Sequence, residues 1–448
     1  MHRLRVYSTF LITAAIAFAQ PALTQGKLQL SLPRAVDIAL EPEGSARVAL
    51  ADESIRIAEI RMSQAKSAFL PKIDGSFQDR NQVVNLRTFG FDFGGAAFPG
   101  FAFPGRVGPF SVLDLRAAAQ APVLDFTTIR KYEASRTGID AAKADKEVTR
   151  DDVANQVGRA YLAALRADAA LRSMQANLAL SEALLVSAQA QKDAGTGTGI
   201  EVTRAQVQLA NDRQRLTVTG NDRQRAILQL MRVIGLDLTM PVELTSTLGY
   251  QPVDVAAIET SLNQARTRRS EVKAQQQHEQ VARMNVSSVE AERLPTVAAF
   301  GDYGTIGRPN IGLQPTRTIG FTLTVPLFDG GRRKDRRDES LTQLRQEQIR
   351  TRDLQQQVEL EVRLAMESLR SAASQVETAR EGLALAQNEV EQAQRRYQAG
   401  VAIPLEVTDA QTRLDRARDN QVAALYNHNL ARLELAAATG SIQEFVHQ

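Results

Sequence analysis

Two similar segments far apart in the chain decide its fold: GTGTGIEVTRAQVQLANDR (195–213) and GVAIPLEVTDAQTRLDRAR (400–418). The offset of 205 residues continues without a gap over 41 positions, of which 12 are identical. The aligned stretch begins on glycine in both copies and ends on glycine in both, at Gly235 and Gly440. A register kept over this length predicts an internal duplication of the chain.

Each copy contains a long stretch without proline, 123–240 in the first copy and 327–403 in the second. Apolar residues recur there at alternating steps of four and three, which is the repeat of a heptad seam. The first seam comprises Val153, Val157, Ala160, Ala164, Ala167, Leu171, Met174 and Leu178. The second comprises Val358, Val362, Ala365, Leu369, Ala372, Val376, Ala379, Leu383, Ala386, Val390 and Ala393. The pattern predicts helices over 128–194 and 332–398, each roughly 100 Å long at 1.5 Å per residue.

Glycines mark the ends of these predicted helices. Gly195 and Gly400 stand where a C′ residue is expected, a short turn follows, and a glutamate opens the returning helix. Each copy therefore ends in a long helical hairpin, at about 128–235 in the first copy and about 332–439 in the second.

Strand-like sequence precedes each long helix. In residues 319–327 (IGFTLTVPL) apolar side chains alternate with glycine and threonine. The alternation covers about the length of a transmembrane β-strand. A partner strand precedes it, with 304–316 as the expected turn, so the second pair of strands spans about 295–328. The first copy repeats the arrangement over about 71–126, and each copy reads as helix, strand, strand, long helix, tip and returning helix.

Residues 1–19 predict a secretory signal peptide. Two arginines precede a short apolar run that ends in Ala-Phe-Ala, a sequence suited to cleavage. A membrane anchor is the alternative, but the run is shorter than the ~20 residues that a spanning helix needs. The repeats are then expected at 20–236 and 253–440, followed by a C-terminal tail at 441–448.

The composition argues against several classes of site. The 448 residues contain no Cys, which excludes disulfides, thiolate metal sites and a Cys nucleophile, and the four His are scattered. A net charge of +3 supplies no basic field for nucleic acid. No GxSxG, HExxH or P-loop pattern occurs, so an envelope hydrolase is disfavoured. We expect no enzyme activity, no metal and no cofactor.

The predicted strands number four per chain, which is too few to close a barrel. An open sheet edge in lipid leaves backbone groups without hydrogen bonds. If the strands are membranous, several chains must share one barrel, and three chains would supply twelve strands and a tube of twelve helices. The alternative is a soluble coiled-coil protein with peripheral hairpins. The export signal and the lipid-length alternation argue against that alternative.

The mature chain resembles the TolC-like outer membrane efflux protein family. The resemblance lies in LSLPRAVDIAL (30–40), FLPKID (69–74), RLPTVAAF (293–300), TVPLFDGGRRKD (324–335) and YQAGVAIPLEVTDAQTRL (397–414). It implies an α+β membrane protein, a homotrimer with a 12-strand β-barrel in the cell outer membrane, continued by a long α-helical barrel through the periplasm. One departure is EPEGSARVAL (41–50), which lacks the family's usual Asn-Pro between two helix segments.

The resemblance also implies a function and partners. The function is the exit duct of a tripartite efflux or type I secretion system, giving passive transport of small molecules or proteins across the outer membrane. The partners are a periplasmic adaptor and an inner-membrane pump of RND or ABC type. The sequence identifies neither the type of pump nor the exported substrate. A periplasmic adaptor is the alternative function. An adaptor should carry one helical hairpin between split β-domains, whereas this chain carries two hairpins and four strands.

Two acids follow the second tip. Glu406 and Asp409 are three residues apart, so they share a helix face. Judged by residue type alone, they complement the dipole of a helix N-terminus. The resemblance assigns them to the channel constriction, where a trimer would stack two rings of carboxylates that attract cations. The first copy has Glu201 and Arg204 there, a pair that can neutralise itself, so the acidic ring is expected only in the second copy.

The resemblance further implies contacts that hold the resting tip closed. Tyr397 matches the family's constriction tyrosine, and Glu201 matches its partner. The family's basic member of this network falls on Ala402, which leaves Arg204 as the alternative cation. Tyr397 can also be interpreted as an amphipathic anchor at a helix end.

Overall fold

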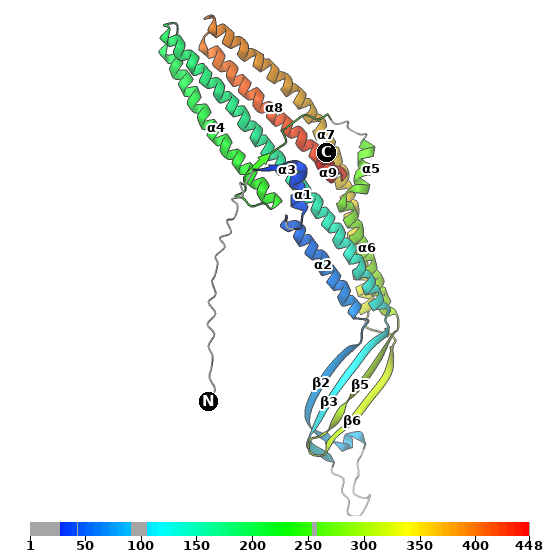
Figure 1. The fold of residues 1–448 in the computed structure, drawn as a ribbon. Coiled ribbons are helices and arrows are strands. Elements are labelled where there is room, and N and C mark those ends of the chain that lie inside the picture. Colours follow the sequence, from blue (N-terminus) through cyan, green and yellow to red (C-terminus); the bar gives the residue numbers. More distant parts are fainter. Residues whose placement is uncertain (1–26, 43, 91–104, 253–257, 448) are drawn as a thin grey trace, which may run out of the picture.

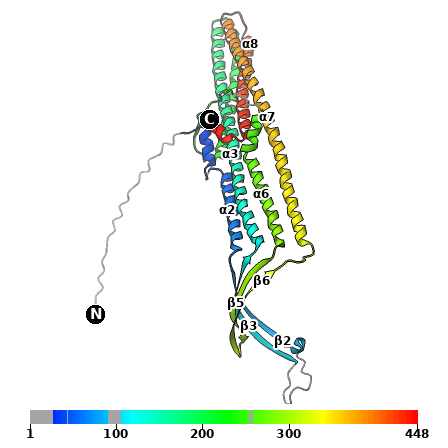
Figure 2. The ribbon, with the colours of Figure 1, turned by 90° about the vertical axis from the view of Figure 1, so that its right-hand side faces the viewer.

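The computed structural model describes residues 27–42, 44–90, 105–252 and 258–447. The predicted signal peptide 1–19 lies outside these residues. The molecule is elongated, with helices over most of its length and a β-sheet at one end (Figures 1 and 2).

Two long helical hairpins form most of the structure. They are built from α3 (Phe126–Asp193) with α4 (Gly199–Ile234), and from α7 (Arg332–Gln398) with α8 (Pro404–Thr439). The bounds of α3 and α7 agree with the predicted helices to within two residues. Among the described residues, no helix combines the length and the apolar character needed to cross a membrane.

An aspartate accepts backbone hydrogen bonds at the start of each long helix. The Asp125 carboxylate accepts hydrogen bonds from the backbone N–H of Thr127 and Thr128, at 2.9 and 3.2 Å. The Asp329 carboxylate accepts from the backbone N–H of Gly331 and Arg333, at 3.2 and 2.9 Å. These bonds satisfy N–H groups that a helix start leaves free, so each strand passes into its helix at a fixed residue.

The predicted heptad seam is mostly buried in α7 and only partly buried in α3. Most of the predicted seam of α7 is buried, and Ala379 and Leu383 are half-buried. In α3 the buried line leaves the predicted positions after Met174 and continues through Asn177 and Ser181. Ala160, Ala167, Leu171 and Leu178 of the predicted seam are only half-buried. Two polar side chains occupy the seam there because they bond to other helices, as described below.

Shorter helices repeat the duplication beyond the aligned segment. α1 (Leu32–Leu40) is followed by α2 (Ala46–Ser67), and α5 (Ile258–Arg268) by α6 (Ser270–Glu290). A Cβ on Gly235, after α4, would lie 1.7 Å from the backbone oxygen of Gly44 in the first break. A Cβ on Gly440, after α8, would lie 2.7 Å from the backbone nitrogen of Arg269 in the second break. Each returning helix therefore ends against the connection between the two short helices of its own copy. The connection between α1 and α2 forms without the Asn-Pro that is usual in the family.

The main core lies at mid-length, where the two copies meet. The short parallel strands β1 (Leu28–Leu30) and β4 (Val242–Leu244) pair there. The Tyr161 hydroxyl of α3 donates to Leu30 O at 3.0 Å, which ties β1 to the long helix. The predicted tail contains α9 (Ile442–Val446), and its two end residues are buried in this core.

The far end is a four-stranded antiparallel sheet in the order β2-β3-β5-β6. The strands are β2 (Lys72–Asn85), β3 (Arg106–Leu124), β5 (Thr296–Arg308) and β6 (Gly312–Thr324). The short 3-10 helices η1 (Leu86–Phe89) and η2 (Ala291–Arg293) flank it. Strand order places the two copies side by side, with β3 paired to β5.

The expected turn at 304–316 is wrong in extent. Pairing continues to Arg308 opposite Gly312, so only three residues connect β5 to β6. Gly304 and Gly307 read as turn residues, but they are strand positions where a neighbouring strand comes close. A Cβ on Gly304 would lie 2.3 Å from Leu115 O, and one on Gly307 would lie 2.1 Å from Gly312 O. The last strand also ends earlier than the expected 327, at Thr324.

The sheet has one apolar and one polar face. Exposed apolar side chains from all four strands share one face: Ile73, Phe77, Leu115, Tyr303, Ile319, Phe321 and Leu323. The other face carries Asp74, Gln78, Asp114, Arg116, Asp302 and Thr318. Ile319 is 81% exposed and Phe321 is 74% exposed. An apolar patch of this kind marks a surface that contacts lipid or another protein.

The glycines at the two ends of the hairpins should differ in their response to alanine. Gly195→Ala has open space for the new Cβ, so only the left-handed backbone is penalised, by roughly 1–2 kcal/mol. Gly235→Ala and Gly440→Ala add a collision with neighbouring backbone and should lower the melting temperature much further. Melting of the purified protein followed by far-UV circular dichroism checks this. Equal shifts for all three variants would contradict the packing described.

Candidate functional site

The two hairpin turns meet at the end of the molecule farthest from the sheet (Figure 1). Both turns have the same backbone geometry. Gly195 and Gly400 have φ of 76° and 72°, and their N–H groups bond back to Lys192 O and Tyr397 O, each at 3.0 Å. The next residues bond to the carbonyls one step earlier, which completes a Schellman motif in each turn. Only glycine adopts this φ without strain, so the duplicated glycines fix where each helix reverses.

Tyr397 lies inside an apolar cluster at the base of the second turn. The cluster joins α3, α7 and α8 through Leu184, Ala386, Val390, Ala393, Tyr397, Val407, Ala410 and Leu414. Tyr397 is 5% exposed, and among the described residues its hydroxyl has no hydrogen-bond partner. Its phenol ring is therefore held by packing.

Glu201 is near Tyr397 but does not bond to it. Burial is the main cause that raises the pKa of Tyr397, and the charge of Glu201 raises this pKa further. The Glu201 carboxylate instead accepts from the backbone N–H of Thr198 at 3.0 Å, as the acid of a capping box. The structure thus brings these two predicted tip residues together without the direct contact that the resemblance implies.

Arg204 is exposed on α4. Among the described residues the structure records no ion pair between Glu201 and Arg204, because the glutamate turns back to cap its helix. Arg204 lines a hollow between the first hairpin and α8, together with Ile200, Leu405 and Thr408.

The two predicted acids at the second tip differ in environment. Glu406 is half-buried, and its Oε1 lies 3.1 Å from Arg396 Nε across the turn. Asp409 is exposed. Asp409 contributes to raising the pKa of Arg413, after the larger effect of the hydrogen bond from Arg413 to Glu389. Of the two acids, Asp409 therefore presents the less compensated charge.

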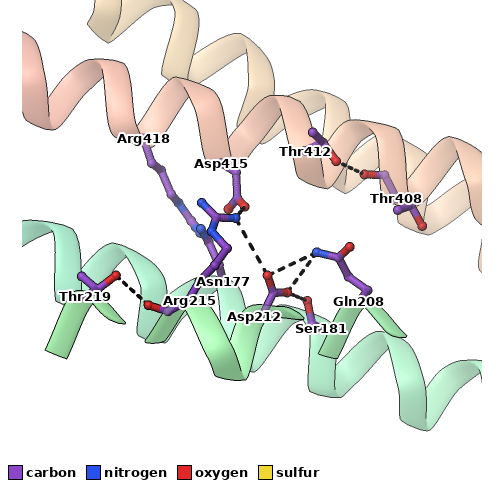
Figure 3. Close-up of polar contacts among 10 residues, drawn as sticks. All are labelled: Asn177, Ser181, Gln208, Asp212, Arg215, Thr219, Thr408, Thr412, Asp415 and Arg418. Atoms are coloured by element: carbon purple, nitrogen blue, oxygen red, sulfur yellow. Dashed lines mark hydrogen bonds and ion pairs between the residues drawn. The ribbon is translucent and has the colours of Figure 1, made fainter. Parts of the chain in front are cut away.

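A polar layer that the sequence pattern does not predict lies between the tip and the middle of the molecule, where the first hairpin meets α8 (Figure 3). Asp212 is 1% exposed and accepts hydrogen bonds from Ser181 Oγ at 2.5 Å and from Gln208 Nε2 at 3.1 Å. Arg215 lies on the same helix as Asp212, and its Nη1 is 3.0 Å from Asp415 Oδ2 on α8. Arg215 also approaches Asp212, at 4.0 Å.

The same layer includes a bond from Arg418 of α8 to Asn177 of α3. Burial raises the pKa of Asp415, and the charges of Asp212 and Asp419 act in the same direction, while Arg215 lowers it. The signal available in the sequence was the pair Asn177 and Ser181, which places polar residues where the apolar seam should continue. Buried polar groups need partners, so this pair indicates a contact with another helix.

Among the described residues no group of three His, Asp or Glu is placed to hold a metal ion. The arrangement at the tip supplies exposed charges, apolar packing and tight turns. Such an arrangement can select ions and hold helices together.

Comparisons with known proteins agree with this geometry. The family model described as outer membrane efflux protein matches residues 43–236 and 261–441, one segment for each copy. The outer membrane efflux protein BepC of Brucella suis is 25% identical over 446 residues, covering 96% of this chain and 90% of that protein. The pyoverdine export outer membrane protein OpmQ of Pseudomonas putida is 26% identical over 319 residues, covering 68% of this chain and 63% of that protein.

Solved structures share the fold at lower identity. The CmeC outer membrane channel of Campylobacter jejuni has a TM-score of 0.75 at 15% identity, over 92% of this chain and 85% of that chain. The outer membrane protein VceC of Vibrio cholerae has a TM-score of 0.72 at 17% identity, over 91% of this chain and 96% of that chain. The family match covers both repeats, so the chain belongs to the outer membrane efflux protein family, whose members are efflux channels of the outer membrane.

Proposed function

We propose that three copies of this chain assemble into a passive exit duct across the outer membrane. The observation that carries the proposal is the open sheet. β2 and β6 each have one neighbour within the chain, so one edge of each strand is unpaired. Unpaired backbone groups in lipid cost several kcal/mol each, and closure into a barrel removes the edges.

Three chains satisfy both the edges and the apolar face. Four strands from each chain make twelve when β2 of one copy pairs with β6 of the next. The apolar face then contacts lipid and the polar face lines the lumen. The helical hairpins of the three copies continue the lumen toward the tips.

We infer that the tips meet a periplasmic adaptor, through which an inner-membrane pump supplies the driving force. The support is the length of the hairpins, since α3 and α7 place the turns roughly 100 Å beyond the sheet at 1.5 Å per residue. The duct itself catalyses no reaction in this proposal. The match to the outer membrane efflux protein family argues against the alternative that this chain is the periplasmic adaptor.

Extraction of the outer membrane tests the proposal. We expect the chain in the outer-membrane fraction as a species three times the monomer mass that resists SDS until heated, and we expect it to form channels in planar lipid bilayers. Recovery as a monomer from the periplasm would contradict the proposal.

Selectivity for cations should depend more on Asp409 than on Glu406. Arg396 already compensates Glu406, whereas Asp409 is exposed. The Asp409 carboxylate and a cation about 4 Å from it attract each other by about 1 kcal/mol in water. Asp409→Asn should therefore lower the cation-to-anion permeability ratio by about fivefold. Glu406→Gln should lower it less.

Reversal potentials in asymmetric KCl measure this ratio. The matched control removes two exposed carboxylates from α7 away from the tip, Glu377→Gln with Glu381→Gln. Selectivity that is unchanged in Asp409→Asn, or lowered as much in the control, would refute the assignment of the acidic ring.

We propose that Tyr397 helps to close the tip through its ring and not through its hydroxyl. An unpaired buried hydroxyl costs about 1–3 kcal/mol, so Tyr397→Phe should keep the closed tip or stabilise it. Tyr397→Ala empties the apolar cluster and should raise the basal conductance. Single-channel recording distinguishes the variants, and a leaky Tyr397→Phe channel would show that the hydroxyl forms the closing contact.

A further inference from the structure

The polar face of the sheet has a second charge pattern, at the end opposite the tips. Lys72, Arg80, Arg116 and Arg308 all point to this face. Strand register establishes this, because Arg80 pairs with Val112 on β3, and Asp114, two residues along β3, pairs with Ile306 on β5. Residues directly opposite each other share a face, and so do residues two apart in one strand.

The two basic side chains nearer the helices are compensated. Lys72 Nζ lies 3.2 Å from Asp74 Oδ2. Arg116 binds both oxygens of Asp114, at 2.7 and 2.6 Å, and approaches Asp302 Oδ1 at 3.3 Å. This part of the face is therefore neutral to acidic.

The two basic side chains farther out have no such compensation. Within the described part of the chain, no carboxylate lies within 4.0 Å of Arg80 or Arg308. Arg80 donates to Gln78 Oε1 at 2.7 Å, and the Arg308 guanidinium carbon lies 3.8 Å from the centre of the Phe110 ring. These neutral contacts orient the guanidinium groups without removing their charge.

Strand register places both arginines far from the helical end of the sheet. Arg80 is paired with Val112, and Arg308 is paired with Gly312. Arg308 is the last paired residue of β5 before the three-residue connection to β6. In the proposed barrel the two arginines therefore lie at the end of this hairpin farthest from the helices, facing the lumen.

We propose that Arg80 and Arg308 of three chains form an anion-binding collar at the outer mouth of the duct, with polyvalent phosphate as its ligand. The collar rests on the proposed trimeric barrel, which brings six guanidinium groups together from two in each chain. Guanidinium binds phosphate oxygens in pairs, and rings of arginine suit phosphate. The duct then has opposite charges at its ends, with acids at the tip and cations at the mouth.

Block of single channels by inositol hexakisphosphate tests the collar. In bilayers of neutral phosphatidylcholine, the anion should block wild-type current when added on the barrel side, and much less when added on the tip side. Arg80→Gln with Arg308→Gln should weaken block by roughly tenfold or more. Arg317→Gln removes a cation from the opposite face of the same sheet and should leave block unchanged.

The outcomes separate the collar from the barrel. Wild-type channels that are not blocked, or block that persists in the double variant, would overturn the collar while leaving the duct intact. Absence of channels in every variant would overturn the trimeric duct and the collar with it. Lipopolysaccharide in the outer leaflet identifies the source of phosphate. If inositol hexakisphosphate blocks the wild type less in bilayers that contain lipopolysaccharide than in phosphatidylcholine, lipid phosphates occupy the collar. If block is the same in both bilayers, the ligand of the collar is a soluble phosphate.

Discussion

The open edges of the four-stranded sheet constrain the rest of the structure. A strand edge in hydrocarbon has no water to satisfy its N–H and C=O groups, so β2 and β6 need partners from outside the chain. The internal duplication supplies two β-hairpins, and their pairing through β3 and β5 leaves one edge from each copy. Closure by other chains then sets the copy number, the lumen and the arrangement of the helices that follow the strands.

The helical part uses two kinds of contact for two purposes. α7 and α8 share an apolar cluster near the tip, to which α3 of the first hairpin contributes Leu184. The first hairpin also meets α8 through directional bonds, from Arg215 to Asp415 and from Arg418 to Asn177. Packing is tolerant of small shifts, whereas an ion pair at hydrogen-bond distance depends on position and angle. The polar layer therefore sets the register of one hairpin against the other.

Much of this architecture could be predicted from the sequence, because its signals are local and repeated. The heptads of α7 and the tip glycines follow from spacing along the chain. The strand lengths could not be predicted, because Gly304 and Gly307 have the composition of a turn and the role of close strand contacts.

The environment of the tip residues could not be predicted either. Glu406 meets Arg396 only because the turn folds one helix back on the other. The hydrogen-bond partners of Asn177 and Ser181 lie on other helices, so the periodicity of α3 alone cannot identify them. By residue type Glu201 could contact Tyr397 or cap its own helix. The structure shows the capping bond, in which Glu201 accepts from the backbone N–H of Thr198.

Cross-linking of the sheet edges tests the central claim most directly. The chain has no Cys, so one cysteine placed on β2 and one on β6 report only on contacts between these edges. Ser76→Cys with Thr316→Cys, scanned along β6 to Thr318 and Thr322, places both thiols on the polar face. The account predicts that oxidation in the outer membrane gives a covalent species of three chains and nothing larger. A ladder that continues beyond three chains, or no cross-link at any register, would contradict it.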